Sequence, residues 1–229
     1  MSISSRLMQG SKLLSRKGLD SFLSGKIASI SAGQRVLNVG AGGDFARVLQ
    51  AGAVKNGFTV TNVDIDPSRH PDVVDDITQS SFQDESFDAI VMLEVLEHVV
   101  NPIGAASEVL RLLKPNGQLI LSTPFIFPLH DRPHDFFRYT KYGLTHLFKE
   151  LVGLEIRERN SWAEAILVLL VRLIFEGGRR YQIASLFLIP IAVLCVPLAV
   201  LVSAILPTDF LTTGYILSGT KRVPSEILV

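Results

Sequence analysis

Short apolar segments alternate with longer segments of helical periodicity between about residue 34 and residue 160. The apolar segments predict strands, and the long ones read RVLNVG, FTVTNVDID, FDAIVML and QLILSTP. One intervening helix has clear limits, because Asn101 is a good N-cap, Pro102 suits the first helical position and the Pro115–Gly117 turn should end it. This alternation is typical of an α/β domain with a mostly parallel sheet and helices on both faces.

A different pattern follows Trp162. No charged residue occurs from Tyr181 to Thr208, and the apolar run Ile183–Leu206 exceeds the roughly 20 residues that span a bilayer as a helix. This part raises the mean hydropathy of the chain to +0.35. The run predicts contact with a membrane lipid surface. The alternatives are a dimer interface and an unusually apolar core helix.

Residues 1–33 combine apolar residues at helical spacing, from Leu19 to Ile30, with five basic residues and one acidic residue, Asp20. The segment therefore predicts an amphipathic helix. It either lies on an anionic membrane surface or packs over the edge of the domain.

The charge balance excludes one class of partner. Lys and Arg together number 22, as do Asp and Glu, so the net charge is zero and no basic face for nucleic acid is expected. The single cysteine, Cys195, excludes a disulfide framework and favours a reducing, cytosolic setting. Composition says nothing about the oligomeric state.

Candidate chemistry lies at the carboxyl ends of the predicted strands, where ligands of such sheets bind. The first strand ends in the glycine-rich turn Gly40–Phe45, which allows a ligand to approach the backbone and the helix N-terminus. Asp64 ends the second strand and can accept hydrogen bonds from both hydroxyls of a ribose. Together they predict an adenosine-type cofactor. NAD is disfavoured because its fingerprint needs glycine where Phe45 stands.

Several motifs occur in order over residues 34–160: VLNVGAGGD, NVDIDP, VVDDITQSSFQDESFDAIVMLEVLEHV and LKPNGQLILSTP. In this combination the chain resembles the class I S-adenosylmethionine-dependent methyltransferases, in particular the type-11 group. The resemblance implies a Rossmann-like, mostly parallel seven-stranded sheet and S-adenosylmethionine as cofactor. Its methyltransferase domain would comprise residues 34–161 and 212–229.

The resemblance also implies residue roles. Gly40 and Gly42 would lie beside the methionine and ribose, and Asp64 would bind the ribose hydroxyls. Asp76 and Ile77 would meet the adenine. The remaining expected cofactor residues are Leu93 and Glu94, which would border the reacting methyl group, together with Asn38 and Asp44.

Asn38 and Asp44 depart from the family pattern, which usually has an acid at the first position and often a glycine at the second. Asn38 still offers an amide for hydrogen bonding. Asp44 could cap the following helix or face the ammonium group of the cofactor. The carboxyl groups of Asp66 and Asp88 are expected to be structural, Asp66 as a cap before Pro67.

The resemblance places the apolar run between the last two strands, which GLEIRERNSW and TTGYILSGTKR resemble. Residues 162–211 are then a hydrophobic, membrane-associated helical insertion whose two ends lie on the same side of a membrane, so a single span is excluded. Pro190 and Pro197 would interrupt a helix, which leaves arms of about 10 residues and about 15 Å. This favours a re-entrant hairpin or peripheral association at the cytoplasmic face.

The segment PFIFPLHDRPHDFFRYT follows the strand QLILSTP and is rich in titratable and aromatic side chains. His130 is the first candidate for a general base and His134 the second, with Asp135 available to orient one of them. Arg138 and Tyr139 are the expected substrate-binding residues. The alternative is an ion pair between Asp135 and Arg138 that orders a lid. The histidines and acids match no strong metal signature, so no metal site is predicted. Glu97 and His98 are more often scaffold than catalyst.

The leading hypothesis is therefore a methyltransferase that uses S-adenosylmethionine on a membrane-linked glycan or lipid, with O-methylation favoured. The acceptor class extends to small molecules, including quinones. The alternatives are a cofactor-binding membrane adaptor without turnover and an NAD-dependent oxidoreductase.

Overall fold

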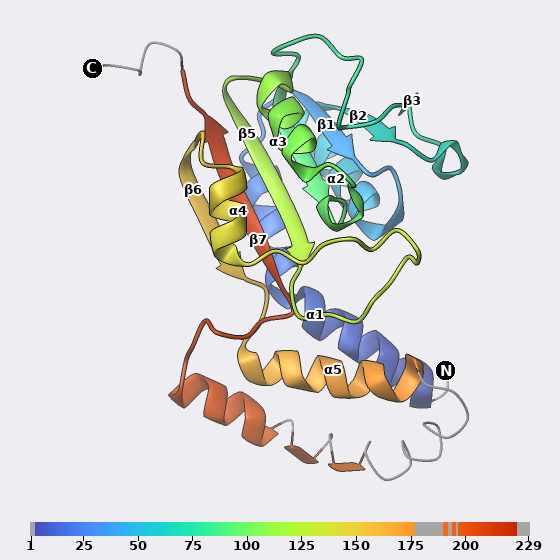
Figure 1. The fold of residues 1–229 in the computed structure, drawn as a ribbon, viewed down its shortest axis with the longest axis vertical. Coiled ribbons are helices and arrows are strands. Elements are labelled where there is room, and N and C mark those ends of the chain that lie inside the picture. The colour runs from blue at the N-terminus through green and yellow to red at the C-terminus, as the bar shows by residue number, and fades with distance from the viewer. Residues whose placement is uncertain (1–2, 177–189, 192–193, 196, 224–229) are drawn as a thin grey trace. The chain divides into compact units, whose positions relative to one another are not determined.

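The computed structural model describes residues 3–176, 190–191, 194–195 and 197–223 (Figure 1). The chain forms two compact units. The first contains residues 1–21, 124–130 and 158–215, and the second contains residues 22–123, 131–157 and 216–229.

The second unit is built on a seven-stranded sheet, ordered β3-β2-β1-β4-β5-β7-β6. The pairs β2–β3, β1–β2, β1–β4 and β4–β5 are parallel, whereas Figure 1 shows β7 running opposite to its neighbours. The predicted Rossmann-like α/β fold is confirmed. The strands are β1 (Arg35–Val39), β2 (Thr59–Asp64), β3 (Val73–Val74), β4 (Phe87–Leu93), β5 (Leu113–Pro124), β6 (Leu151–Glu158) and β7 (Gly214–Lys221).

The helices are α1 (Ile3–Ala28), α2 (Gly43–Asn56), α3 (Pro102–Leu112), α4 (Lys141–Leu147) and α5 (Trp162–Glu176), with short 3-10 turns η1 (Pro67–Arg69) and η2 (Leu96–His98). The caps predicted at Asn101 and Asp66 are confirmed. Asn101 and Thr140 accept backbone N–H groups at the starts of α3 and α4, and Gly57 ends α2 at φ 80°. Asp66 likewise caps η1 by accepting from Ser68 N.

One boundary differs from the sequence prediction. Helix α3 ends at Leu112, and β5 begins at Leu113 instead of after the Pro115–Gly117 turn. The residue before a proline avoids helical geometry, so Lys114 already favours an extended backbone. Asn116 then adopts φ 62°, which a helix does not allow.

The register of the central strands brings their carboxyl ends to one edge. Val39 of β1 pairs with Val63 of β2 and with Met92 of β4. Gly40, Asp64 and Glu94 therefore follow at one end of three neighbouring strands. Strand β4 is buried along most of its length, which explains its continuous apolar sequence.

The last part of α1 belongs to this unit and packs against the rest of it, which agrees with one of the two alternatives for the N-terminal segment. Leu23, Ile27 and Ile30 are buried. A Cβ at position 52 would lie 2.3 Å from Ile27 Cγ2, so Gly52 permits this contact, and Asn56 Nδ2 donates to Ile27 O at 3.0 Å.

The first unit contains the earlier part of α1 and helix α5, which Figure 1 shows side by side. Lys17 Nζ forms an ion pair with Glu164 Oε1 at 2.7 Å. Gly18 N donates to Arg159 O at 3.0 Å, and a Cβ at Gly18 would lie 2.5 Å from that oxygen. A larger residue at position 18 would force the backbones apart.

The segment between β6 and β7 comprises α5, helical residues 190–191, 194–195 and 197–205, and connecting residues. Residues 177–189, 192–193 and 196 of the predicted insertion lie outside the described residues. Among the helices that the structure describes, none is both long and apolar enough to cross a membrane. Trp162 Nε1 donates to Leu206 O at 3.1 Å and so joins the two ends of the segment.

Asp88 links three strands of the sheet. Its carboxylate accepts from Arg35 N at 2.8 Å and from Lys114 Nζ at 2.8 and 2.9 Å. Burial raises the pKa of Asp88, but the hydrogen bonds from Arg35 and Lys114 outweigh it and hold the pKa below its usual value. The stabilisation is then present above the unfolded pKa and is lost as the pH falls through the folded pKa.

We expect Asp88→Asn to lower the free energy of unfolding at pH 7 by about 1–3 kcal/mol, the cost of unsatisfied partners. The difference from the natural protein should begin to shrink as the pH falls below the unfolded pKa of about 3.9 and should be lost below the lowered folded pKa. Urea unfolding across pH measures this, with the exposed Asp20→Asn as control. A difference that is constant with pH would contradict the account.

Candidate functional site

The turn after β1 requires glycine at position 40. Gly40 has φ 93°, and a Cβ there would lie 2.6 Å from Val95 Cγ2. Its N–H donates to Val63 O at 2.8 Å, which fixes the turn against the end of β2. Because Gly40 has no side chain, a ligand can approach the backbone of this turn closely.

Helix α2 begins directly after this turn. Gly42 is its N-cap and makes no side-chain cap hydrogen bond. The first N–H groups of the helix therefore suit a polar or anionic ligand group. Capping was one of two alternatives for Asp44, but Gly42 occupies the N-cap position, and Asp44 lies in the first turn and forms an ion pair with Arg47.

Asp64 faces the glycine turn. Its Oδ2 accepts from Ala41 N and its Oδ1 from Asp66 N, both at 2.9 Å. The side chain is 9% exposed, and Arg69 Nε lies 3.8 Å from Oδ2. A carboxylate offers about four acceptor positions, so two hydrogen bonds leave capacity for hydroxyl groups of a ligand.

Asn38 stabilises the glycine turn after β1 by hydrogen bonds. It is buried, and its Nδ2 donates to Asn62 Oδ1 at 2.9 Å and to Gly40 O at 3.3 Å. The amide that stands where the family usually has an acid thus holds the glycine turn and the neighbouring strand together.

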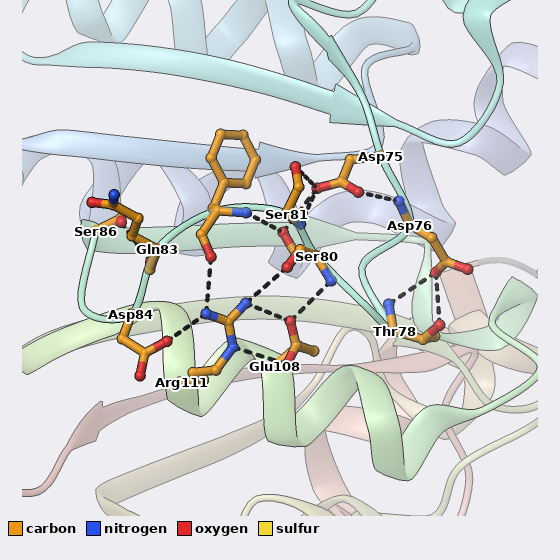
Figure 2. Close-up of polar contacts among 11 residues, drawn as sticks. Asp75, Asp76, Thr78, Ser80, Ser81, Gln83, Asp84, Ser86, Glu108 and Arg111 are labelled. Atoms are coloured by element: carbon orange, nitrogen blue, oxygen red, sulfur yellow. Dashed lines mark hydrogen bonds and ion pairs between the residues drawn. The ribbon is translucent and has the colours of Figure 1, made fainter.

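Asp76 lies in the loop between β3 and β4 (Figure 2). Its Oδ1 accepts from Thr78 N at 2.8 Å and from Thr78 Oγ1 at 2.9 Å. Ile77 beside it is only 7% exposed, whereas Ile65, directly after Asp64, is 68% exposed. The sequence reasoning missed Ile65 and Arg69, although both lie within five residues of Asp64, the last residue of β2.

Leu93 and Glu94 complete the edge. Leu93 is buried at the end of β4, and Glu94 adopts φ 56°. Glu94 N donates to Ser122 O at 3.0 Å, and Ser122 Oγ donates to Glu94 Oε1 at 2.9 Å. Val95, which touches Gly40, joins this turn to the glycine turn. The structure thus brings the predicted cofactor residues at the ends of β1, β2 and β4 together.

Residues 131–140, which we call the strap, are bound to η2. Phe136 N and Phe137 N both donate to Glu97 O, at 2.9 and 3.2 Å. Tyr139 Oη donates to Leu96 O at 3.1 Å. Burial, followed by the charge of Glu97, raises the pKa of the Tyr139 phenol, so the phenol remains a donor.

Asp135 and Arg138 form the ion pair that was one of the two predictions for this segment. Arg138 Nη2 lies 2.6 Å from Asp135 Oδ2, and Nη1 contacts Oδ1. The Asp135 side chain is 3% exposed. The hydrogen bond to Asp135 raises the pKa of Arg138 despite burial, and the charges of Asp135, Glu97 and Glu94 raise it further.

The strap also fixes His98, for which the sequence favoured a scaffold role over a catalytic one. His98 Nδ1 lies 2.7 Å from His134 O. A carbonyl oxygen only accepts, so Nδ1 must carry the proton. The other nitrogen, Nε2, lies 3.7 Å from Glu97 Oε1 and 3.8 Å from Asp131 Oδ2.

The two histidines predicted as bases lie in different units. His134 belongs to the second unit, where its ring is exposed and meets the Phe136 ring at 6.1 Å. His130 belongs to the first unit. There its ring packs edge-on against Phe127 at 5.7 Å, and its Nδ1 lies 3.4 Å from Pro128 O.

Comparison with known proteins supports a single family. A family model described as a methyltransferase domain matches residues 13–162. A ubiquinone biosynthesis O-methyltransferase of Haemophilus ducreyi is 32% identical over 107 residues, which cover 40% of this chain and 45% of that protein. A demethylmenaquinone methyltransferase of Tropheryma whipplei is 34% identical over 143 residues, which cover 54% and 55%. The chain thus spans about half the length of these relatives.

Solved structures share the fold. A phosphoethanolamine N-methyltransferase 2 of Haemonchus contortus, in complex with S-adenosyl-L-methionine, has a TM-score of 0.58 at 18% identity. The match covers 90% of this chain and 52% of that chain.

We expect Arg138→Gln to destabilise the protein by about 3–5 kcal/mol, because it leaves the buried Asp135 carboxylate without its guanidinium partner. The double variant Asp135→Asn/Arg138→Gln should lose less than the single variant. Urea unfolding measures both, and Arg157→Gln, which removes an exposed ion pair with Glu155, is the control. A double variant less stable than the single one would contradict this reading.

Proposed function

Because the chain belongs to the family of methyltransferase domains, we propose that it transfers a methyl group from S-adenosylmethionine to an oxygen atom of a membrane-linked acceptor, a glycan or a lipid. One observation carries the cofactor assignment: Asp64 ends β2 with its carboxylate hydrogen-bonded to the glycine turn of β1. When bound, S-adenosylmethionine supplies a methyl group activated by its sulfonium.

The residues present fit such a cofactor. Gly40 leaves the backbone open, and the uncapped N-terminus of α2 offers N–H groups to the methionine end. Asp64 has acceptor capacity for the ribose hydroxyls. Asp76 would accept from the adenine amino group, and the exposed Ile65 supplies an apolar surface for the adenine ring.

The acceptor would approach from the end of β4, where Glu94 leads into η2. An alcohol needs a base to remove its proton as the methyl group is transferred. We propose His98 for this role, ahead of His130 and His134. The carbonyl of His134 orients its ring and keeps the proton of the neutral imidazole on Nδ1, so Nε2 is the basic nitrogen that would take the proton. Glu97 and Asp131 lie near Nε2 and would stabilise the resulting imidazolium.

Arg138 and Tyr139 receive a different role in this proposal. Arg138 binds Asp135 within the strap, and Tyr139 binds the backbone of η2. We therefore assign both to holding the strap over η2 instead of binding an anionic substrate directly. They would affect the acceptor through the position of His98.

The membrane-linked acceptor is supported by two independent observations. Two relatives are named as a ubiquinone biosynthesis O-methyltransferase and a demethylmenaquinone methyltransferase, and quinones are among the acceptors expected from the sequence. In the first unit, large apolar side chains are exposed along the insertion: Ile191, Leu194, Leu198, Leu201, Ile205, Leu206 and Phe210. Such a surface suits contact with a bilayer. The insertion would associate with the cytoplasmic face of the membrane, either peripherally or as a re-entrant hairpin.

The methyl-transfer proposal is tested with labelled S-adenosylmethionine, bacterial membranes and mass spectrometry of the labelled product. We expect label in an ether of a lipid or glycan. His98→Ala should lower kcat about 100-fold or more and leave the affinity for S-adenosylhomocysteine within about threefold. His134→Ala should retain activity, because the contact to His98 uses its backbone carbonyl. If His98→Ala remains active and His130→Ala shows a comparable loss of kcat, His130 is the general base instead.

The membrane proposal predicts that Leu194→Glu/Leu198→Glu/Leu201→Glu weakens binding to phosphatidylglycerol-containing vesicles at least tenfold. Each exposed leucine removed from lipid forfeits about 1.5–3 kcal/mol of apolar burial. Val54→Glu is the matched control, since Val54 is 81% exposed on α2 in the second unit. Vesicle co-sedimentation measures both. Equal binding of the triple variant and the natural protein would reject the bilayer as the partner.

A further inference from the structure

The loop that carries Asp76 is held by a network of side chains that the cofactor assignment does not use (Figure 2). The loop runs from Asp75 to Ser86, between β3 and β4. Most of its polar anchors come from two residues one helical turn apart on α3, Glu108 and Arg111.

Arg111 supplies the larger share of these anchors. Its Nη1 donates to Phe82 O at 2.8 Å and to Asp84 Oδ1 at 2.6 Å, and its Nη2 donates to Ser80 O at 3.0 Å. The main chain of Arg111 also binds the loop, because Glu85 N donates to Arg111 O at 2.9 Å. The guanidinium therefore forms hydrogen bonds with three residues of the loop, Ser80, Phe82 and Asp84.

Glu108 orients Arg111 and grips the loop as well. Its two carboxylate oxygens accept from Arg111 Nε at 3.0 Å and from Nη2 at 2.7 Å. Its Oε2 also accepts from Ser80 N at 2.9 Å. The hydrogen bonds with Arg111 lower the pKa of Glu108, and burial only partly opposes this, so the pair stays charged at neutral pH.

Asp75 connects the gripped part of the loop to Asp76. Its Oδ2 accepts from Ser80 Oγ and Ser81 N, both at 2.9 Å, and its Oδ1 accepts from Asp76 N at 2.9 Å. Asp75 N donates to Asp64 O at 3.1 Å. A continuous chain of hydrogen bonds thus runs from Arg111 through Ser80 and Asp75 to the backbone of Asp76.

We propose that Arg111 is a positioning residue for recognition of the cofactor's base: it holds the Asp75–Ser86 loop so that the Asp76 carboxylate meets the exocyclic amine of adenine. This inference rests on the assignment of Asp76 under the proposed function. Arg111 does not touch the cofactor in this account. It acts on the affinity and base selectivity of the site and not on the chemical step.

The guanidinium is well suited to this role. A fork of donors can satisfy two carbonyl oxygens and two carboxylates simultaneously, whereas a lysine ammonium on a flexible stem cannot reach all of them. Lysine at this position would retain the charge and lose the geometry. Rescue by lysine should therefore be incomplete, and this separates positioning from a general charge effect.

The test compares two ligands, S-adenosylhomocysteine and S-inosylhomocysteine, which carries an oxo group in place of the adenine amine. The natural protein should prefer the adenine compound by about tenfold or more, the equivalent of roughly one good hydrogen bond. Asp76→Asn should reduce this preference, since the amide no longer presents an anionic acceptor. Calorimetry with the full chain measures all four affinities.

Arg111→Gln should weaken S-adenosylhomocysteine binding about tenfold, leave S-inosylhomocysteine binding nearly unchanged and keep kcat at saturating cofactor within about twofold. Arg111→Lys should recover only part of the loss. Combined with Asp76→Asn, Arg111→Gln should have little further effect, because both changes act through one contact. Arg157→Gln is the control and should match the natural protein. If Arg111→Gln does not fold, Glu108→Gln, which preserves shape, provides the same comparison.

The outcomes distinguish the two levels of the account. An adenine preference that survives Asp76→Asn would reject the assignment of Asp76. The preference for adenine could instead be abolished by Asp76→Asn and remain intact in Arg111→Gln and Glu108→Gln. This result would reject only the positioning role of Arg111. Equal weakening of both ligands by Arg111→Gln, or additivity with Asp76→Asn, would also overturn it, since a general structural defect has that signature.

Discussion

The hydrogen bond from Ala41 N to Asp64 Oδ2 is the interaction on which the candidate site depends. It joins the turn after β1 to the end of β2, and it exists because parallel pairing brings these two strand ends to the same edge of the sheet. Gly40 makes the approach possible, as a side chain at this position would collide with Val95. The same hydrogen bond therefore stabilises the turn after β1 and holds the Asp64 carboxylate beside that turn.

Around this contact the second unit uses charged side chains mainly to hold loops in place. Arg111 and Glu108 hold the loop before β4, and Asp135 and Arg138 stabilise the strap that fixes His98. Loops carry function on a rigid scaffold, and the ordering of such loops must come from specific polar contacts because they lack an apolar core of their own. The first unit differs, since several of its large apolar side chains are exposed, among them Leu194, Leu198 and Leu201.

Most of the scaffold was predictable from the sequence, because it depends on local rules. The apolar segments, the caps at Asn101 and Thr140 and the glycine at position 57 specify strands and helix ends without knowledge of distant residues. The sites named from the motifs at the ends of β1 and β2 also fall at one edge. The end of α3 was misplaced because the effect of Pro115 on Lys114 was overlooked.

The contacts that orient the site could not be predicted in the same way. Arg111 meets Ser80 and Phe82 across about thirty positions of sequence, and His98 meets the carbonyl of His134, which no side-chain pattern reveals. Asp135 and Arg138 are three residues apart, yet the sequence alone left a catalytic and a structural role equally open. Burial of the carboxylate, which only the fold supplies, favours the structural one.

The most direct test of the whole account is calorimetric titration of the full chain with S-adenosylhomocysteine and, separately, with NAD. We predict saturable binding of S-adenosylhomocysteine, no measurable binding of NAD, and at least a tenfold weaker affinity in Asp64→Ala, which would lose the hydrogen bonds proposed to the ribose. Absence of binding to S-adenosylhomocysteine, or an Asp64→Ala variant that binds it as well as the natural protein, would contradict the central claim.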